Sequence, residues 1–371
     1  MAITRLGPNQ DITAAKIAGT INFKNIVING DMSIAQRSNS TASITGNGYH
    51  TIDRFQTINT SLGTWTQSQS TDVPSGQGFA KSLKMDCTTA DASPASSDLL
   101  QLRTAFEGQN LQQLKFGTSS AESLTLSFWV KSNKTGTYTM VFFHRDATKQ
   151  FSKSYTINSA NTWEKKTITV VGNTANSIDN DNAKSFDIWF NLGAGSNFTS
   201  GSLSSNWETE TEANYAVGQV NLADSTSNEW YITGIQLEAD TSASDFEFLP
   251  FDVNLMRCQR YYEKSYSYAT APGTNTYVGA TRFNGSTDAS SNMVVCIEYA
   301  TQKRTSPTQT YYTPSGTSGS WNIVRSGSSG TATANNWNNN ETKLNAYFTF
   351  GASHNFANGY VEGQWTADAE L

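Results

Sequence analysis

The stretch Leu124-Thr-Leu-Ser-Phe-Trp-Val-Lys131 alternates apolar and polar residues. Positions 124, 126, 128 and 130 are apolar, and among the residues between them only Trp129 is not polar. Successive side chains of a β-strand point to opposite faces, so this period of two predicts a half-buried strand. Such a strand belongs to a sheet that packs one face against a second layer.

Four further stretches carry strand signals. Phe186-Asp-Ile-Trp-Phe-Asn-Leu192 alternates in the same way, and Lys165-Lys-Thr-Ile-Thr-Val-Val171 also favours a strand. Tyr138-Thr-Met-Val-Phe-Phe-His144 is apolar on both faces, as expected of a central strand. In Trp230-Tyr-Ile-Thr-Gly-Ile-Gln-Leu-Glu238 the alternation changes phase at Gly234, which predicts a β-bulge.

These strands are separated by turns rich in Gly, Asn, Ser and Thr. The pattern predicts an all-β protein in which residues 25–250 form a jelly-roll-like β-sandwich. Alternation returns in Met293-Val-Val-Cys-Ile-Glu-Tyr-Ala300 and in Leu344-Asn-Ala-Tyr-Phe-Thr-Phe350. Residues 267–371 are therefore expected to form a second, smaller β domain, whose last strand buries Trp365.

Between the two predicted domains the pattern becomes helical. Leu255, Cys258 and Tyr262 follow one another at i, i+3 and i+7. Asp252 is the expected N-terminal cap. The sequence thus predicts a short helical linker over residues 251–266.

Residues 1–24 lack a clear period and hold at most two helical turns, beginning at Asp11. So short a helix is not stable alone. We expect an arm that orders against a partner or a neighbouring subunit; the alternative is a frayed terminus. The attachment residues expected in this arm are apolar: Ile3, Leu6, Ile12 and Ile17.

Composition excludes several classes of function. Only 15% of the 371 residues are charged, and the net charge is −6 without a basic run, so no nucleic-acid partner is expected. Apolar runs are too short for a membrane span, and the N-terminus lacks the apolar core of a signal peptide. The three cysteines are far apart and form no metal-binding pair. We expect synthesis in a reducing cytoplasm.

No catalytic or metal signature is present, so we expect no enzyme activity and no cofactor. The sequence lacks a GxSxG elbow and an HExxH motif. His144, in an apolar strand, favours a structural role. Asp179-Asn-Asp-Asn182 opens like a calcium loop but has Lys184 where glycine is required, so a structural calcium ion stays an alternative only. The acidic run from Glu208 to Glu212 is expected to be solvated.

Aromatic residues in polar loops are the more productive signal. Trp and Tyr rings stack on the apolar faces of sugars, while nearby polar groups bind their hydroxyls. Packing in a core is the alternative for each ring. The residues predicted to bind a glycan receptor are Tyr311, Tyr312, Trp321, Trp337, Trp207 and Tyr215.

An ordered series of motifs resembles the virion fibre proteins of tailed bacteriophages, notably those of marine and cyanobacterial phages. The series covers the chain from about residue 25 to its end. Besides the strands at 124–132 and 230–238, it consists of Asn25-Ile-Val-Ile-Asn-Gly-Asp-Met-Ser-Ile-Ala-Gln-Arg37, Tyr49-His-Thr-Ile-Asp-Arg-Phe55, Arg257-Cys-Gln-Arg-Tyr-Tyr-Glu-Lys-Ser-Tyr266 and Trp365-Thr-Ala-Asp-Ala-Glu-Leu371.

The resemblance implies a jelly roll like that of carbohydrate-binding modules, a distal β domain and a homotrimer, and it carries no catalytic residues. Within it, Asp53-Arg54-Phe55 is expected to place an ion pair beside a core aromatic ring. Arg257 and Arg260 are expected to brace the junction between the domains.

The expected function is that of a structural tail or capsid fibre in the virion. The arm would dock on phage tail or capsid proteins, and the rest would adsorb to host-surface polysaccharide without entering a membrane. Two alternatives stay open: a stand-alone glycan-binding module and a polysaccharide depolymerase.

Overall fold

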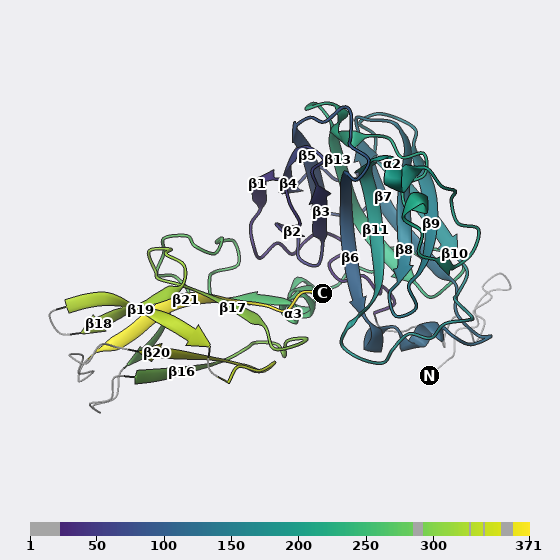
Figure 1. Cartoon of the computed structure of the whole chain (residues 1–371). Coiled ribbons are helices and arrows are strands. Elements are labelled where there is room, and N and C mark those ends of the chain that lie inside the picture. Colours follow the sequence, from purple (N-terminus) through teal and green to yellow (C-terminus); the bar gives the residue numbers. More distant parts are fainter. Residues whose placement is uncertain (1–22, 285–291, 326–327, 337, 350–358) are drawn as a thin grey trace, which may run out of the picture.

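In a computed structural model, the structure describes residues 23–284, 292–325, 328–336, 338–349 and 359–371 (Figure 1). The chain is nearly all β and forms a jelly-roll-type sandwich followed by a second β domain, which confirms the predicted fold class. Within the described residues, none of the helices is both long and apolar enough to cross a membrane.

The sandwich consists of two antiparallel sheets. The six-stranded sheet has the order β1 (Ser40–Ile44), β4 (Thr64–Ser70), β5 (Ser82–Thr89), β13 (Glu229–Glu238), β7 (Leu124–Ser132) and β10 (Glu164–Val170). The seven-stranded sheet has the order β12 (Glu208–Thr209), β9 (Lys149–Ile157), β8 (Gly136–His144), β11 (Lys184–Ala194), β6 (Leu99–Glu107), β3 (Gln56–Thr60) and β2 (Gly48–Tyr49).

The main core lies between these two sheets, as the alternation predicts. Phe128 of β7 is edge-on to Phe190 of β11 at 5.2 Å and to Tyr155 of β9 at 5.1 Å. Trp230 of β13 is fully buried beside Phe190. Interlocking aromatic rings from both layers fix the spacing of the sheets.

The predicted bulge is present in β13. Its pairing with β7 shifts register between Thr233 and Gln236, and Gly234 adopts φ +63°. A Cβ atom at Gly234 would lie 2.6 Å from Phe79 and 3.1 Å from Trp129. Glycine therefore allows both the left-handed backbone and the close approach of two aromatic rings.

The linker differs from the sequence expectation. Helix α3 spans Phe251–Gln259, and its N-terminal cap is Pro250 without a side-chain hydrogen bond, so the expectation that Asp252 caps the helix is wrong. Asp252 lies in the first turn instead, where a carboxylate favours the helix dipole. Residues Tyr262–Lys264 form strand β14 and join the second domain rather than the helix.

The second domain is built around the last strand, β21 (Tyr360–Asp368). The order of its sheet is β14, β21, β18 (Ser320–Arg325), β19 (Ser328–Asn336), β20 (Lys343–Thr349) and β16 (Asn292–Glu298); β15 (Thr281–Asn284) and β17 (Thr308–Tyr312) also pair with β21. Trp365 is 4% exposed in this domain's core, as predicted.

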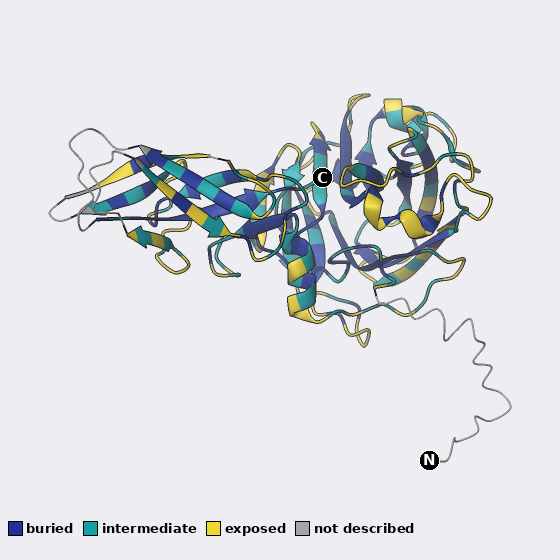
Figure 2. Cartoon of the chain, turned by 90° about the horizontal axis from the view of Figure 1, so that it is seen from below, coloured by how far each residue is buried: buried dark blue, intermediate teal, exposed yellow. Residues whose placement is uncertain are grey.

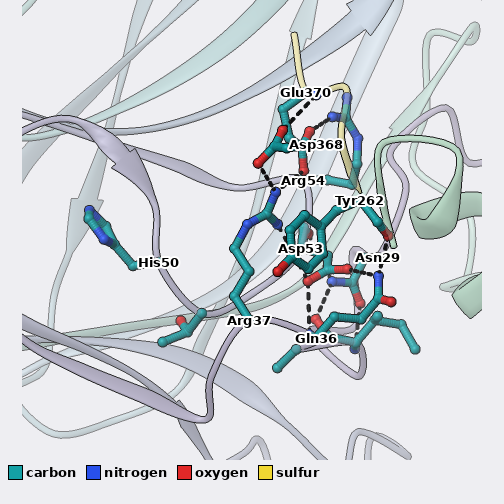
Figure 3. Close-up of polar contacts among 12 residues, drawn as sticks. Asn29, Gln36, Arg37, His50, Asp53, Arg54, Tyr262, Asp368 and Glu370 are labelled. Atoms are coloured by element: carbon teal, nitrogen blue, oxygen red, sulfur yellow. Dashed lines mark hydrogen bonds and ion pairs between the residues drawn. The ribbon is translucent and has the colours of Figure 1, made fainter. Parts of the chain in front are cut away.

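Buried charges join the two domains, and the C-terminal end of the chain lies between them (Figures 1 and 3). Arg54 pairs with Glu370, and both side chains are almost fully buried. Arg37 pairs with Asp53, Asp368 and Glu370. The ion pair expected at Asp53 and Arg54 therefore exists as two pairs, each with a partner outside the motif, beside the buried Phe55.

Four of the resemblance motifs meet at this junction, since they contribute Arg37, Arg54, Tyr262 and Glu370 (Figure 3). The guanidinium of Arg37 lies 3.7 Å from the centre of the Tyr262 ring. These motifs therefore encode the attachment of one domain to the other.

The expected arm lies almost wholly outside the described residues, and so do Ile3, Leu6, Ile12 and Ile17. The described chain begins at Phe23. The Glu247 carboxylate accepts the backbone N–H groups of Phe23 and Asn25 at 3.1 and 2.9 Å, which holds this segment beside the chain that follows β13.

Candidate functional site

Two predicted glycan-binding residues lie in the core of the second domain. Trp321 is fully buried, and its indole N–H donates to the Gln364 carbonyl at 2.9 Å. It packs over Gly363, where any Cβ atom would collide with the ring. Tyr311 is 4% exposed, and its hydroxyl donates to Asn336. Neither ring offers a free face to a sugar, which corrects the expectation for both.

Of the other predicted aromatic residues, Tyr312 and Trp207 lie in different domains. Tyr312 is half-buried against Tyr266, with 5.9 Å between ring centres, and Trp337 lies outside the described residues. Trp207 packs edge-on against Phe151 at the edge of the sandwich core and donates to the Val171 carbonyl. Among the described residues, Tyr312 and Trp207 therefore do not share a site.

A different set of aromatic residues lines a groove on the outer face of the six-stranded sheet. We call it the Phe248 groove; it encloses about 180 Å³ and is lined by Gly76, Gln77, Phe79, Ser127, Trp129, Lys165, Gly234, Asp245, Phe246 and Phe248. The ring of Phe79 forms its floor, with Phe246 and Phe248 centred 5.0 and 5.1 Å away. Phe248 is 49% exposed. The groove thus offers aromatic surface to solvent from three distant segments.

The backbone around Gln236 positions these rings. The buried Gln236 side chain donates to the Asp245 carbonyl at 3.1 Å and accepts the Glu247 N–H at 2.8 Å. These two bonds fix the chain on either side of Phe246. Trp129 stands on β7 between Thr233 and Lys165 of the neighbouring strands. Sheet pairing and one buried amide therefore fix the shape of the groove.

Polar side chains with free hydrogen-bonding groups stand at its rim. Gln77, Lys165 and Asp245 are exposed, and their side chains make no hydrogen bond or ion pair within the described part of the chain. They offer an amide, an ammonium and a carboxylate group. An aromatic floor beneath a few free polar groups is typical of small-ligand sites, and hydroxyl-rich ligands with apolar C–H faces suit it.

The aromatic surface continues along the same strands beyond the groove. Tyr231 and Lys131 pair in register two residues from Thr233 and Trp129, so they share that outer face. The ammonium of Lys131 lies 4.3 Å from the centre of the Tyr231 ring. Here the charges are already paired, since Lys131 binds Asp72. This part of the face is thus better suited to extending a contact than to anchoring one.

The outer face of the seven-stranded sheet carries a second aromatic cluster, which is covered. Trp189 of β11 stacks on Phe143 at 4.7 Å and is edge-on to Tyr215 at 5.1 Å. The Arg103 guanidinium lies 4.0 Å from the centre of the Trp189 ring. Trp189 and Tyr215 are only 2% and 5% exposed. Tyr215, one of the predicted glycan ligands, is therefore part of a closed cluster.

The acidic run is more ordered than the sequence suggested. Glu208 lies on edge strand β12 and accepts hydrogen bonds from Ser204, Asn214 and Gln150. Burial opposes ionisation, but these bonds outweigh it and hold the pKa of Glu208 below its usual value. All three bonds are made to Oε1 of Glu208, and a carboxylate that is held ionised is a poor general acid.

The side chain of His144 is buried, and both ring nitrogens lie within hydrogen-bonding distance of a neighbouring group. His144 Nε2 lies 3.1 Å from the Ser177 carbonyl, and its Nδ1 lies 3.2 Å from the Asn173 amide. Burial lowers the pKa of His144, which favours the neutral ring. No group of three or more His, Cys, Asp or Glu side chains able to hold a metal ion occurs among the described residues.

The sequence contained one signal for the Phe248 groove. Trp129 breaks the polar side of the alternating stretch 124–131, so an aromatic ring on the outer face of the sheet was foreseeable. Phe79, Phe246 and Phe248 come from two remote loops. Their meeting depends on long-range pairing that no local pattern encodes.

No protein-family model matches the sequence, and a search of curated proteins gives no match. Similar solved structures include the enzymatically active domain of bacteriophage CBA120 tailspike protein 4, at 15% identity and TM-score 0.31. That match covers 58% of this chain, which spans only 21% of the length of the tailspike chain.

Two further similar structures are smaller. A putative sugar-binding protein from Bacteroides thetaiotaomicron matches over 58% of this chain and 100% of its own, at 10% identity and TM-score 0.32. A family 11 carbohydrate-binding module from Clostridium thermocellum matches over 56% of this chain and 99% of its own, at 12% identity and TM-score 0.27.

Proposed function

We propose that this chain is an adhesive protein that binds glycans through the Phe248 groove. The observation that carries the proposal is the groove itself, in which the half-exposed ring of Phe248 stands beside Trp129 and beneath unpaired rim groups. Sugar rings stack their C–H faces on such aromatic surface. Gln77, Lys165 and Asp245 would then bind hydroxyl groups and select among glycans.

We further propose that the protein serves as a structural fibre of a tailed-phage virion. The ordered motif series supports this role. The buried junction supports it too, because a fibre needs its successive domains to be held in a fixed relative orientation. In this proposal residues 1–24 attach the chain to tail or capsid proteins, a homotrimer forms, and the Phe248 groove adsorbs to host polysaccharide. Closed threefold symmetry suits such a fibre.

We propose a binding role rather than an enzymatic one, and the two acids described next support this proposal. Glu208 is held ionised by hydrogen bonds, and Glu210 accepts from the Tyr215 hydroxyl. Glycoside hydrolysis by paired carboxylates requires one that remains protonated as general acid. Incubation with polysaccharides that the protein binds is expected to release no reducing ends.

The direct test is binding to a panel of purified surface polysaccharides by the wild-type chain and two alanine variants. Phe248→Ala removes the exposed ring of the groove. Phe251→Ala is a matched control, because Phe251 is 51% exposed and lies on α3 outside the groove. We expect Phe248→Ala to lose binding and Phe251→Ala to bind like the wild type. Wild-type binding by Phe248→Ala would refute the role of the groove.

A further inference from the structure

A cavity of about 480 Å³ lies where the sandwich meets α3. Its walls come from the entering segment at Phe23, the end of β6, the turns that follow β6, and the α3 region. It is separate from the Phe248 groove and shares no lining residue with it.

Three arginines line this cavity, and two of them are neutralised by carboxylates. Arg260 donates two hydrogen bonds of 2.7 Å to Glu107, and Arg54 pairs with Glu370. The side chain of Arg257, the third, makes no ion pair or hydrogen bond to any other described residue. Arg260 braces the junction as expected, through its pair with Glu107. Arg257 was expected to do the same, but its side chain forms no such bond with a described residue.

The surroundings of Arg257 compensate its charge only in part. Its guanidinium lies 5.3 Å from the centre of the Phe23 ring. Glu247 attracts it, but both Glu247 oxygens already accept backbone N–H groups. Burial lowers the pKa of Arg257 in spite of that attraction, so the cation gains less from its neighbours than it loses with water.

The other groups at the mouth suit a hydroxyl-rich ligand. The exposed amides of Asn110 and Gln113 have no side-chain hydrogen bond to the described residues, and Phe23 is 49% exposed. A planar guanidinium binds carboxylate and other oxyanions through paired N–H groups.

We propose that this cavity binds a sugar unit bearing an anionic oxygen group, with Arg257 as the charge partner and Asn110 and Gln113 on its hydroxyls. The proposal rests on the proposed glycan-binding function only in taking the ligand to be a sugar. It makes the protein selective for acidic surface polysaccharides, with neutral sugar units in the Phe248 groove and the charged unit at Arg257.

Calorimetric titration of the full chain with galacturonic acid, glucose 6-sulfate and neutral galactose tests this proposal. The first two probes separate a carboxylate from a sulfate ligand. We expect binding of at least one anionic sugar, weaker or absent binding of galactose, and a loss of affinity with added salt. The proposal would be overturned if the chain bound neither galacturonic acid nor glucose 6-sulfate.

Variants locate the binding. Arg257→Gln is expected to weaken binding about tenfold or more, because charge-assisted hydrogen bonds are lost. Gln113→Glu changes an exposed side chain, leaves the fold intact and is expected to weaken binding by repulsion. Phe248→Ala should retain anionic-sugar binding, which separates this proposal from the Phe248 groove. Unchanged affinity in both Arg257→Gln and Gln113→Glu, or its loss in Phe248→Ala, would contradict a separate site.

Discussion

The ring of Phe248 packs on that of Phe79 with 5.1 Å between their centres, yet 49% of Phe248 remains exposed. An aromatic ring in a protein core is covered on both faces. One side of the ring is thus supported by protein, and the other faces solvent. This relationship makes the Phe248 groove a prepared surface rather than an accidental patch, because its shape costs little to organise when a ligand binds.

The first prediction concerns Trp321, which the sequence suggested as a glycan-binding residue and the structure places in a core. Trp321→Ala removes a fully buried indole from the second domain and is expected to lower the free energy of unfolding by about 3–5 kcal/mol. Tyr277→Ala is the control, since Tyr277 is 63% exposed. Denaturant unfolding of both variants measures the difference. Equal stability of the two would place Trp321 outside the core and return it to the list of possible ligands.

The junction makes a second prediction. Glu370→Gln leaves the Arg54 guanidinium buried without its carboxylate, and breaking such a pair costs about 3–5 kcal/mol. The same change at Glu298, whose pair with Lys343 is exposed, should cost within about 0.5 kcal/mol. We expect Glu370→Gln to make the two domains unfold in separate thermal transitions. One transition at the wild-type temperature would show that Glu370 does not hold the domains together.

His144 gives a prediction for pH. Burial lowers its pKa in the folded state, so below about pH 6.5 the unfolded chain binds a proton that the folded chain does not. Stability therefore falls as the pH drops from about 6.5 towards the folded-state pKa. His144→Gln, which cannot be protonated, should flatten this part of the profile of unfolding free energy against pH. Parallel profiles would mean that His144 titrates alike in both states.

Strands whose sequence alternates clearly between apolar and polar residues could be predicted from the local pattern. The alternation in 124–131 and 186–192 corresponds to β7 and β11, and the phase change at Gly234 is a true bulge. These features depend on the period of two and on glycine chemistry, which neighbouring residues determine. The prediction that Asp252 caps α3 was wrong because Pro250 can begin a helix without a side-chain hydrogen bond.

The site was harder to predict, because it depends on which segments meet. Trp321 is flanked in sequence by glycine-rich loops, but β18 pairs with β21 and carries its ring into the core. Phe79 and Phe248 lie far apart in sequence and meet only through the sheet pairing that places β5 beside β13. The carboxylate partner of Arg54 comes from the last residues of the chain, which no spacing rule reveals.

The most direct test of glycan binding at the Phe248 groove is to follow the indole N–H signals of the wild-type chain by NMR during titration with a polysaccharide selected from the panel. Trp129, Trp189 and Trp321 are assigned by single Trp→Phe substitutions. The account predicts that the Trp129 signal shifts in proportion to saturation while the covered Trp189 and the buried Trp321 stay unchanged. A shift of Trp189 with Trp129 unaffected would contradict it and move the binding site to the seven-stranded sheet.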